Sequence, residues 1–397
     1  MAGGRGALES LGVKRDAPFL AQCREASLGD LFGGVYAGRR VLVTGHTGFK
    51  GSWLALWLTE MGANVCGLAL PAEAAPNHSR LLDLPIDEAL IDLRDAAAVA
   101  DVLSRFQPEI VFHLAAQPLV RRSYREPAAT FDVNVMGLVH LLEAVRATAS
   151  VRVVVNATSD KCYLNRETSD GYREADSLGG HDPYSASKAC AEIVSASYRS
   201  SFLSAADGRG HPVALATARA GNVVGGGDWS EDRLIPDLVR SAVSGVATSI
   251  RHPQATRPWQ HVLEPLAGYL LLGERLLADP HSAAEAWNFG PDASGQLSVA
   301  QVIVSFARRW STVRCDVERA PQPHEAGLLH LDCAKARERL GWRPVWDAAV
   351  AIERTAAWYR RQHETGALPS GDDIDRYVAD ARLAGLGWAS GRMAQTA

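Results

Sequence analysis

The sequence lacks several features that would assign it to a specialised class of protein. Its 397 residues include only six cysteines, none of them in a Cys-x-x-Cys pair or beside a cluster of histidines. This scarcity argues against a zinc site and a redox-active dithiol, and it favours reduced thiols in a cytosolic protein. No apolar run approaches the roughly 20 residues that span a bilayer, and the first residues lack the apolar stretch of a signal peptide. We therefore expect a cytoplasmic protein that holds no metal.

The chain also has no large excess of positive or negative charge. The formal net charge is −4, and charged residues make up 22% of the chain. Neither nucleic acid nor a membrane surface is therefore expected as a partner, and an anionic ligand would have to be met by local charge. Hydrophobic residues reach 47%, which excludes extensive disorder and allows one large core or two unequal ones.

Short apolar runs alternate with stretches of helical spacing in the N-terminal half. The apolar runs lie at 39–44, 64–70, 110–114, 151–157 and 213–219. Helical spacing follows at 53–61, 96–106, 131–146 and 184–202. This alternation is typical of right-handed βαβ crossovers and of a parallel sheet that is covered on both faces. The predicted fold class is α/β, with a Rossmann-type doubly wound parallel sheet.

The pattern loosens after Gly221, where Gly, Pro, Asp and Arg become frequent. Further helices are expected at 234–243, 262–277, 298–310 and 334–340, and a strand is expected at 287–290. We predict a cofactor-binding domain over 28–221, to which 262–290 returns. A smaller, partly interleaved C-terminal α/β domain would comprise 222–261 and 291–397. Residues 1–27 show no sustained period and are expected to be a disordered extension.

A glycine-rich segment follows the first predicted strand and opens the first predicted helix. Gly45, Gly48 and Gly51 are spaced G-x-x-G-x-x-G. This spacing suits a tight turn, a close approach of the backbone to a pyrophosphate, and close packing of helix on strand. The N–H groups at the helix start would face the phosphates. In this setting the motif predicts a dinucleotide site, with candidate contacts at Gly45, His46, Thr47, Gly48, Phe49, Lys50 and Gly51.

One part of the dinucleotide fingerprint is absent. The strand predicted at 64–70 ends without the Asp or Glu that usually holds the adenosine ribose, and the next acid is Glu73. No arginine cluster suited to a 2′-phosphate replaces it, so NAD is favoured over NADP, and the missing acid is consistent with loose binding. Either Lys50 and His46 face the phosphates in compensation, or they are a solvated lysine and a turn histidine.

Tyr184 and Lys188 form a Tyr-x-x-x-Lys pair, so both lie on one face of a predicted helix. A free phenol, with a pKa of about 10, is a poor base at neutral pH. A lysine ammonium and an oxidised nicotinamide, both positive, stabilise the phenolate. The tyrosine can then take a hydroxyl proton while the adjoining carbon gives up a hydride. Because the pair also occurs by chance, a structural role is the alternative.

Thr158, Asp160 and Lys161 lie at the carboxyl end of the strand predicted at 151–157. Ligands bind at this edge of doubly wound sheets. Three reactive side chains exceed what a plain redox step requires. The alternative is an ordinary polar loop.

These motifs together resemble the extended short-chain dehydrogenase/reductase superfamily, and within it the CDP-glucose 4,6-dehydratase family. The glycine loop and the Tyr–Lys pair are shared by the whole superfamily. Asp160-Lys161 stands where the related dTDP-glucose dehydratases carry Asp-Glu, and it is the more diagnostic feature. The resemblance begins at about residue 28 and rests on TGHTGFKGSW (44–53), HLAAQPLV (113–120), TSDKCY (158–163), GYREADSLGGHDPYSASKACAE (171–192), ARAGNVVGGGDW (218–229), RPWQHV (257–262) and DCAKARERLGWRP (332–344).

The resemblance implies an internal redox dehydration of a nucleotide sugar, CDP-glucose above others, with NAD recycled at each turnover. Tyr184, helped by Lys188 and Thr158, would oxidise C4 of the hexose. A base would then remove the C5 proton while an acid protonates the departing C6 hydroxyl, and the hydride would return to C6. We expect Asp160 to be the acid and Lys161 the base. The reversed or shared assignment stays open because each group shifts the pKa of the other.

The resemblance also implies contacts for the ligands and a homodimer. The residues expected near adenine are Asp92 and Leu93. Those expected under the nicotinamide ribose are Leu114, Ala115, Ala116 and Gln117. Candidates for the sugar-nucleotide diphosphate are Asn222, Arg233 and Arg257, with weaker candidates at Gln260 and His261. Arginine forks suit phosphate oxygens, whereas surface arginines and a turn asparagine would be the structural interpretation.

Two segments depart from the family pattern, the 27-residue extension and Thr168-Ser169-Asp170, where relatives carry an aromatic-rich stretch. The second departure puts details of the substrate loop in doubt. The alternatives are a 4-epimerase or a dehydratase for another nucleotide sugar, and a non-catalytic NAD-binding module. An epimerase does not need Asp160-Lys161. A non-catalytic module does not need Tyr184, Lys188 and Thr158.

Overall fold

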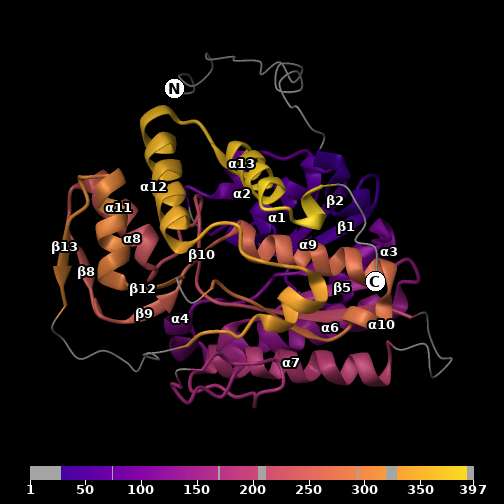
Figure 1. Ribbon diagram of the computed structural model, residues 1–397. Helices are drawn as coiled ribbons and strands as arrows, with labels where there is room; N and C mark the ends of the chain where they lie inside the picture. Colours follow the sequence, from indigo (N-terminus) through magenta and orange to yellow (C-terminus); the bar gives the residue numbers. More distant parts are fainter. Residues whose placement is uncertain are drawn as a thin grey trace, which may run out of the picture.

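The structure is a computed structural model that describes residues 28–73, 75–168, 170–203, 212–292, 295–318 and 329–390. The extension at 1–27 and Ser169 of the departing loop lie outside these residues. Figure 1 shows a central sheet between layers of helices, with a smaller group of helices and strands at one side.

Seven parallel strands form the central sheet in the order β11-β6-β5-β4-β1-β2-β3. The chain builds one half with β1 to β3 and then crosses to build the other half with β4 to β6, so the order reverses between β1 and β4. Such a reversal opens a crevice at the carboxyl ends of the strands. The predicted doubly wound α/β fold is confirmed. The strands are β1 (Arg40–Thr44), β2 (Asn64–Ala69), β3 (Asp87–Leu90), β4 (Ile110–His113), β5 (Val153–Ala157), β6 (Ala214–Ala220) and β11 (Ala286–Phe289).

Each face of the sheet is covered by its own layer of helices. Alternate side chains of a strand point to opposite faces, so Val41 and Val43 enter one hydrophobic cluster and Leu42 enters the other. The first cluster is completed by α1 (Phe49–Glu60) and α9 (Leu263–Ala278). The second is completed by α3 (Ala96–Phe106), α6 (Gly137–Ala147) and α7 (Pro183–Ser201).

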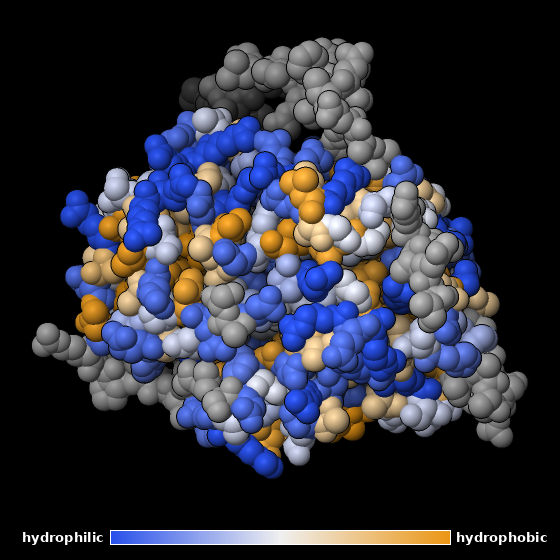
Figure 2. Space-filling view, in the orientation of Figure 1, coloured by the Kyte–Doolittle hydropathy of each residue, from blue (hydrophilic) through white to orange (hydrophobic). Residues whose placement is uncertain are grey.

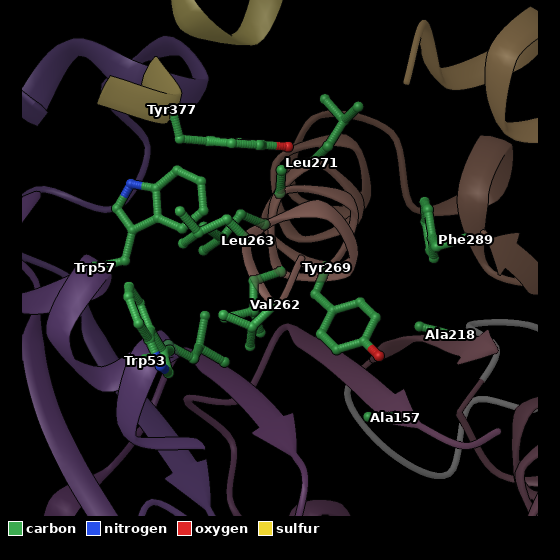
Figure 3. Close-up of a cluster of buried hydrophobic side chains, with 14 of the residues drawn as sticks. Trp53, Trp57, Ala157, Ala218, Val262, Leu263, Tyr269, Leu271, Phe289 and Tyr377 are labelled. Carbon is green, nitrogen blue, oxygen red and sulfur yellow. The ribbon is translucent and has the colours of Figure 1, made fainter. Parts of the chain in front are cut away.

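The first cluster fixes the start of α1. Figure 3 shows Trp57 of α1 beside Leu263 and Tyr377, and Trp53 beside Val262. Both tryptophans are fully buried, and Trp53 Nε1 donates a hydrogen bond of 2.8 Å to the carbonyl of Gly226. This packing holds the glycine-rich loop that precedes the helix.

The helix predicted at 131–146 is part of a longer helical segment that runs from Pro127 to Ala147. It consists of α5 (Pro127–Phe131), the π-helical turn η2 (Asp132–Met136) and α6. Among the described residues it is the one helix that is long and apolar enough to cross a membrane. Its apolar side, however, packs into the second cluster through Leu138, Leu141, Leu142 and Val145.

Residues after β6 build the smaller part and then return to the sheet. The smaller part contains α8 (Leu234–Ser244), α11 (Val299–Arg309) and the strand pairs β8 (Thr248–Ile250) with β13 (Cys315–Val317) and β9 (Thr256–Pro258) with β12 (Gln296–Ser298). Between them, α9 and β11 rejoin the central sheet. Figure 2 shows that the surface on this side of the molecule mixes hydrophilic and hydrophobic residues. The division into domains at 28–221 with 262–290, and 222–261 with 291–397, stays a prediction.

The C-terminal helices have no counterpart among the predicted elements. In Figure 1, α13 (Ser370–Leu383) lies in yellow above α1 and α9, and α12 (Ala348–Thr365) lies to the left of them, beside α11. The first and last described elements meet where Phe32 of η1 (Leu28–Gly34) stacks on Trp388 of η7 (Gly387–Ala389), with ring centroids 4.9 Å apart. The remaining elements are α2 (His78–Leu82), α4 (Val120–Arg125), η3 (Asp160–Cys162), β7 (Val223–Val224), β10 (Gln260–His261), α10 (Pro280–Ala283) and η6 (Ala336–Leu340).

Candidate active site

The glycine-rich loop connects β1 to α1 next to the reversal of strand order. Gly45 has a φ of +76°, and a Cβ at this position would lie 2.7 Å from the nitrogen of Ala115. A Cβ on Gly51 would lie 2.1 Å from the Gly45 carbonyl oxygen. Gly48 caps α1 without a side-chain hydrogen bond, so no capping side chain occupies the N–H groups at the helix start. These features fit the pyrophosphate of a dinucleotide.

His46 of this loop turns toward β2 and β3. Its ring lies against Gly67, where a Cβ would come within 2.3 Å of the ring, and its Nε2 lies 2.9 Å from Glu88 Oε1. The histidine is buried. The second strand, β2, lacks the acidic residue that usually ends it. Glu88, on the edge strand β3, therefore places a carboxylate beside the glycine-rich loop on this side. The assignment of His46 to the cofactor stays a prediction.

The loop at 114–117 after β4, expected under the nicotinamide ribose, is held by hydrogen bonds from two directions. Thr44 Oγ1 accepts from the N–H groups of Leu114 and Ala115, each at 3.1 Å. Gln117 donates its N–H to Asn134 Oδ1 at 2.8 Å. The loop is thus fixed between β1 and the helical segment that begins at Pro127.

Asp92 and Leu93, expected near adenine, follow β3. Asp92 forms an ion pair with Arg94, with Oδ2 and Nη2 2.6 Å apart. Leu93 is buried and packs against Gly137 at the start of α6. The structure gives Leu93 a core contact and leaves the adenine assignment of both residues a prediction.

The loop after β5 and the helix α7 bring the five predicted catalytic side chains together. Lys188 Nζ donates to the carbonyl of Ala157 at 3.2 Å. Thr158 Oγ1 donates to Glu192 Oε1, one helical turn beyond Lys188, at 2.5 Å. Tyr184 lies one turn before Lys188 and is buried. The loop that carries Asp160 and Lys161 therefore lies beside the Tyr–Lys helix.

Asp160 and Lys161 begin η3 and form a close pair. Lys161 Nζ lies 3.7 Å from Asp160 Oδ1, and Ser159 Oγ donates to the same oxygen at 3.0 Å. The Asp160 side chain is 3% exposed, whereas that of Lys161 is 31% exposed. A Cβ on Gly221 would lie 3.2 Å from Asp160 Oδ2. The pair thus combines a buried acid with a more accessible amine.

Burial changes the proton affinities of the Tyr–Lys pair. Burial raises the pKa of Tyr184 to about 12, the charge of Asp160 adds to this, and the charge of Arg233 opposes it. Burial lowers the pKa of Lys188 to about 8, although the carboxylate of Glu192 acts in the opposite direction. Tyr184 is therefore a neutral phenol at neutral pH, and it becomes a base only when further positive charge is placed beside it.

Lys50 belongs to the same cluster. Burial and the charges of Arg233, Lys188 and Lys161 lower its pKa to about 7, and Asp160 opposes the change. Three cationic side chains therefore act on Lys50, opposed by one buried carboxylate. Such an excess of positive charge favours an anionic ligand.

Arg233 is the predicted diphosphate contact that lies beside this cluster. It precedes α8, its Nη1 lies 2.9 Å from Asp228 Oδ2, and its charge acts on Tyr184 and Lys50. Arg257, on β9, donates through Nη1 to the carbonyl of Thr256 at 3.0 Å.

The other predicted substrate contacts form hydrogen bonds and packing contacts within the protein. The Asn222 carbonyl accepts the N–H of Gln260 at 3.2 Å. Gln260 is buried, and its Nε2 donates to the carbonyl of Phe289 at 3.0 Å. His261 is fully buried, with its ring 4.9 Å from that of Trp346. These contacts favour a structural role for Gln260 and His261, and their assignment to the substrate stays a prediction.

A cavity of about 410 Å³ has Pro258, Asp332 and Arg337 in its lining. None of the five predicted catalytic residues lines it. Pro258 also lies on the side of Gly221 that faces Asp160, because a Cβ on Gly221 would lie 3.3 Å from Pro258 Cγ and 3.2 Å from Asp160 Oδ2.

Comparison with known proteins identifies the family. The sequence model of the GDP-mannose 4,6 dehydratase family matches residues 42–355. The chain belongs to this family. The chain is 49% identical over 329 residues to the CDP-glucose 4,6-dehydratase of Salmonella typhimurium. This match covers 82% of the chain and 91% of the relative. The chain is 27% identical to the dTDP-glucose 4,6-dehydratase of Streptomyces antibioticus, over 81% of the chain and 92% of the relative.

Solved structures of the same fold contain NAD. DesIV, a dTDP-glucose 4,6-dehydratase from Streptomyces venezuelae with NAD and TYD bound, superposes with a TM-score of 0.68 at 26% identity, over 82% of this chain and 98% of its own. The UDP-glucose 4-epimerase of Thermus thermophilus in complex with NAD gives a TM-score of 0.67 at 25% identity, over 81% and 99%. The family match and the named relatives make this protein an enzyme of the dehydratase class that acts on nucleotide sugars.

Three polar residues at the site were not predicted from the sequence: Glu88, Ser159 and Glu192. The spacing of Tyr184, Lys188 and Glu192, each four residues apart, is a signal that places all three on one helix face. Glu88 gave no such signal, because it lies on a short edge strand that the sequence did not indicate.

Proposed function

We propose that the protein converts CDP-glucose to CDP-4-dehydro-6-deoxyglucose and water, with NAD recycled at each turnover, and that it does so in the cytoplasm. The observation that carries the proposal is the Asp160–Lys161 pair beside the Tyr184–Lys188 pair. An epimerase needs only the second pair. The name of the relative at 49% identity supports CDP-glucose as the substrate.

The glycine-rich loop, the loop at 114–117, Asp92 and Leu93 would hold NAD, which when bound supplies reversible acceptance of a hydride. Tyr184 takes the proton of the C4 hydroxyl as C4 becomes a ketone. Its pKa of about 12 in this structure must fall for that step, and positive charge beside the phenol lowers it. Lys188, one turn away, contributes such a charge while it is protonated.

Asp160 and Lys161 carry the elimination. The C4 ketone acidifies the C5 proton, which one of the pair removes while the other protonates the departing C6 hydroxyl, which leaves as water. The hydride taken from C4 would then return to C6 and the base would give its proton back to C5, which completes the product. We assign Asp160 as the acid and Lys161 as the base. Asp160 is the buried member of the pair and Lys161 the more accessible one.

Arg233, Arg257 and Asn222 are the proposed contacts of the diphosphate. Guanidinium groups offer two parallel donors to phosphate oxygens. Asp228, which pairs with Arg233 at 2.9 Å, holds this guanidinium in place beside the cluster. The cavity lined by Pro258 and Arg337 would take part of the nucleotide.

The test is an activity assay of the purified protein with NAD and, in parallel, CDP-glucose, dTDP-glucose and UDP-glucose. We expect CDP-glucose to give the ultraviolet absorbance that 4-keto-6-deoxy sugars develop in alkali, without net formation of NADH. A 4-epimer without this absorbance would identify an epimerase instead. Steady accumulation of NADH would identify a simple dehydrogenase. If dTDP-glucose or UDP-glucose gave this absorbance faster than CDP-glucose, the proposed substrate would be wrong and the proposed reaction would stand.

We also propose a homodimer through α5, η2 and α7. These elements pack against one another, and they carry the exposed apolar side chains of Phe131, Met136 and Ile193. Large apolar side chains on adjoining helices are typical of a surface that another protein covers. A second copy of the chain is the proposed partner.

A further inference from the structure

A buried carboxylate lies behind the catalytic side chains and has no part in the proposed chemistry. Glu192 is 4% exposed and follows Tyr184 and Lys188 at four-residue spacing on α7. All three side chains therefore share one face of the helix. This face is turned toward the carboxyl end of β5, where Lys188 contacts Ala157 and Glu192 contacts Thr158.

Both oxygens of Glu192 accept hydrogen bonds. Oε1 accepts from Thr158 Oγ1 at 2.5 Å. Oε2 accepts from Thr217 Oγ1 and from Arg219 Nη2, each at 2.8 Å. Arg219 is itself buried and donates through Nη1 to the hydroxyl of Tyr163 at 2.8 Å. The carboxylate is therefore held in one orientation.

These contacts keep Glu192 ionised. Burial alone would raise its pKa, but the hydrogen bond and charge of Arg219, with the two threonine hydroxyls, lower it below the ordinary value. An ionised carboxylate can only accept hydrogen bonds. The hydrogen of the Thr158 hydroxyl must consequently point at Glu192. The hydroxyl oxygen of Thr158 then offers only its lone pairs to any other partner.

We propose that Glu192 is a positioning residue for the reaction: it holds the Thr158 hydroxyl as a donor toward the interior and places a negative charge one helical turn from Lys188. The proposal rests on the dehydratase function proposed above. A hydroxyl that donates to a carboxylate becomes a better acceptor. Thr158 would accordingly accept a hydrogen bond from the C4 alcohol and would not donate one to the C4 ketone.

Several charged or titratable groups face Lys188, and Glu192 is the one that opposes its burial most strongly. Cys162 of η3 also favours the ammonium form. His113 of β4 and Lys50 of α1 interact with the ammonium from other elements. Removal of the Glu192 charge should lower the pKa of Lys188 further. Activity that needs the ammonium would then be lost at a lower pH.

The test compares Glu192→Gln, which removes the charge, with Glu192→Asp, which keeps it. We expect Glu192→Gln to reduce kcat about 100-fold with little change in KM, and to move the alkaline limb of the pH profile down by about one unit. Glu192→Asp should keep the limb close to the wild-type position. Thr217→Val is the matched control, because it removes a hydrogen bond to the same carboxylate but leaves the charge and the Thr158 contact.

Glu192→Gln leaves Arg219 buried without its counter-ion and could fail to fold. Glu192→Gln combined with Arg219→Met removes both charges and is the second variant. If a folded variant without the Glu192 charge kept the wild-type kcat and alkaline limb, the proposal would be wrong.

A readout without turnover separates this proposal from the proposed function. The chain contains only five lysines, so competitive acetylation across pH, followed by mass spectrometry, can report the titration of Lys188 alone. The pH midpoint of Lys188 acetylation should be lower in Glu192→Gln and unchanged in Glu192→Asp, whichever substrate the enzyme uses. An unchanged midpoint in Glu192→Gln would overturn the proposal even if the wild type dehydrates CDP-glucose. Failure of the wild type to dehydrate any nucleotide sugar would refute the function without affecting this measurement.

Discussion

Lys161 and Asp160 differ in their exposure. The Lys161 side chain is 31% exposed, whereas Asp160 beside it is almost fully buried. Lysine can serve as a base because its pKa responds to neighbouring charge, whereas an arginine in the same place would stay protonated. In the proposed mechanism, this residue is the base of the second proton transfer, after oxidation at C4.

We predict that Lys161→Ala separates the two halves of the reaction. Loss of a positioned acid or base typically costs about 10²- to 10⁴-fold, so dehydration should fall by that factor while oxidation at C4 continues. Single-turnover absorbance of reduced nicotinamide would reveal the stalled intermediate state. Lys335→Ala is the matched control, because that amine pairs with Glu285 at 2.6 Å and has no assigned part in the site. Wild-type turnover of Lys161→Ala would refute the assignment.

The proximity of the predicted catalytic side chains could be predicted because their order along the chain fixes their place. Thr158 to Lys161 follow a buried strand, and Tyr184 and Lys188 share a helix face. Their catalytic roles stay a prediction. The direction of His46 could not be predicted in this way. Its ring fills the space over Gly67 and reaches Glu88, and both contacts depend on the pairing of strands that lie far apart in sequence.

At the scale of the elements, a chain of hydrogen bonds joins the C-terminal helices to the glycine-rich loop. Trp358 Nε1 donates to Ser370 Oγ at 2.9 Å, and Ser370 Oγ lies 2.8 Å from His78 Nε2. His78 Nδ1 lies 2.8 Å from Ser52 Oγ, which donates to the carbonyl of Phe49 at 2.9 Å. Donors and acceptors alternate along the chain when His78 is neutral and carries its proton on Nδ1. Helices α12 and α13 are thereby linked to the start of α1.

We predict a pH-dependent effect of His78→Gln. Burial lowers the pKa of His78 to about 3 in the folded protein. The contribution of neutral His78 to the free energy of unfolding is therefore complete above the unfolded pKa of about 6.5, and it is lost as the pH falls below that value. At pH 7 the variant should lose about 2 kcal/mol of unfolding free energy. At pH 5 the difference should nearly vanish, because the wild type has itself lost about 2 kcal/mol from this histidine.

Urea unfolding at the two pH values measures this difference. His281→Gln is the control, since His281 is exposed and should change neither value. A gap between wild type and His78→Gln that stays constant from pH 7 to pH 5 would show that His78 is not held neutral.

Most elements of the central sheet could be predicted, and the exceptions have physical reasons. β3, Asp87–Leu90, is a short edge strand whose side chains are largely exposed, so it lacks the apolar run that marks its neighbours. α13 contains mostly polar residues and is anchored by long-range contacts such as that of Tyr377 with Glu264, at 2.8 Å. α12 is different, because its buried Ala351, Ile352 and Thr355 have helical spacing and would support a prediction.

At the scale of the whole molecule, exposed large apolar side chains are spread over many elements, from Leu81 on α2 to Leu383 on α13. Val304, for example, lies on α11 of the smaller part. Exposure alone therefore does not distinguish an interface from ordinary surface. Phe131, Met136 and Ile193 form the proposed interface because their elements α5, η2 and α7 pack against one another.

We predict that Met136→Glu combined with Ile193→Glu converts a wild-type dimer to a monomer, since two charges would be buried at the interface without partners. Light scattering coupled to size exclusion would report the mass. Val304→Glu is the control, because Val304 is 54% exposed, similar to Ile193 at 58%, and should leave the dimer intact. A monomeric wild type, or a dimer that survives the double substitution, would contradict the proposed interface.

The basic side chains near Asp160 have a consequence for how a ligand would arrive. The charges of Arg233, Lys188 and Lys161 act on Lys50 at this site, in a chain whose formal net charge is −4. A doubly charged diphosphate would be attracted to this local positive charge. Added salt weakens that attraction within a Debye length of about 8 Å at physiological ionic strength. Capture of the substrate should therefore slow as ionic strength rises, while the steps that follow capture, enclosed by protein, keep their pace.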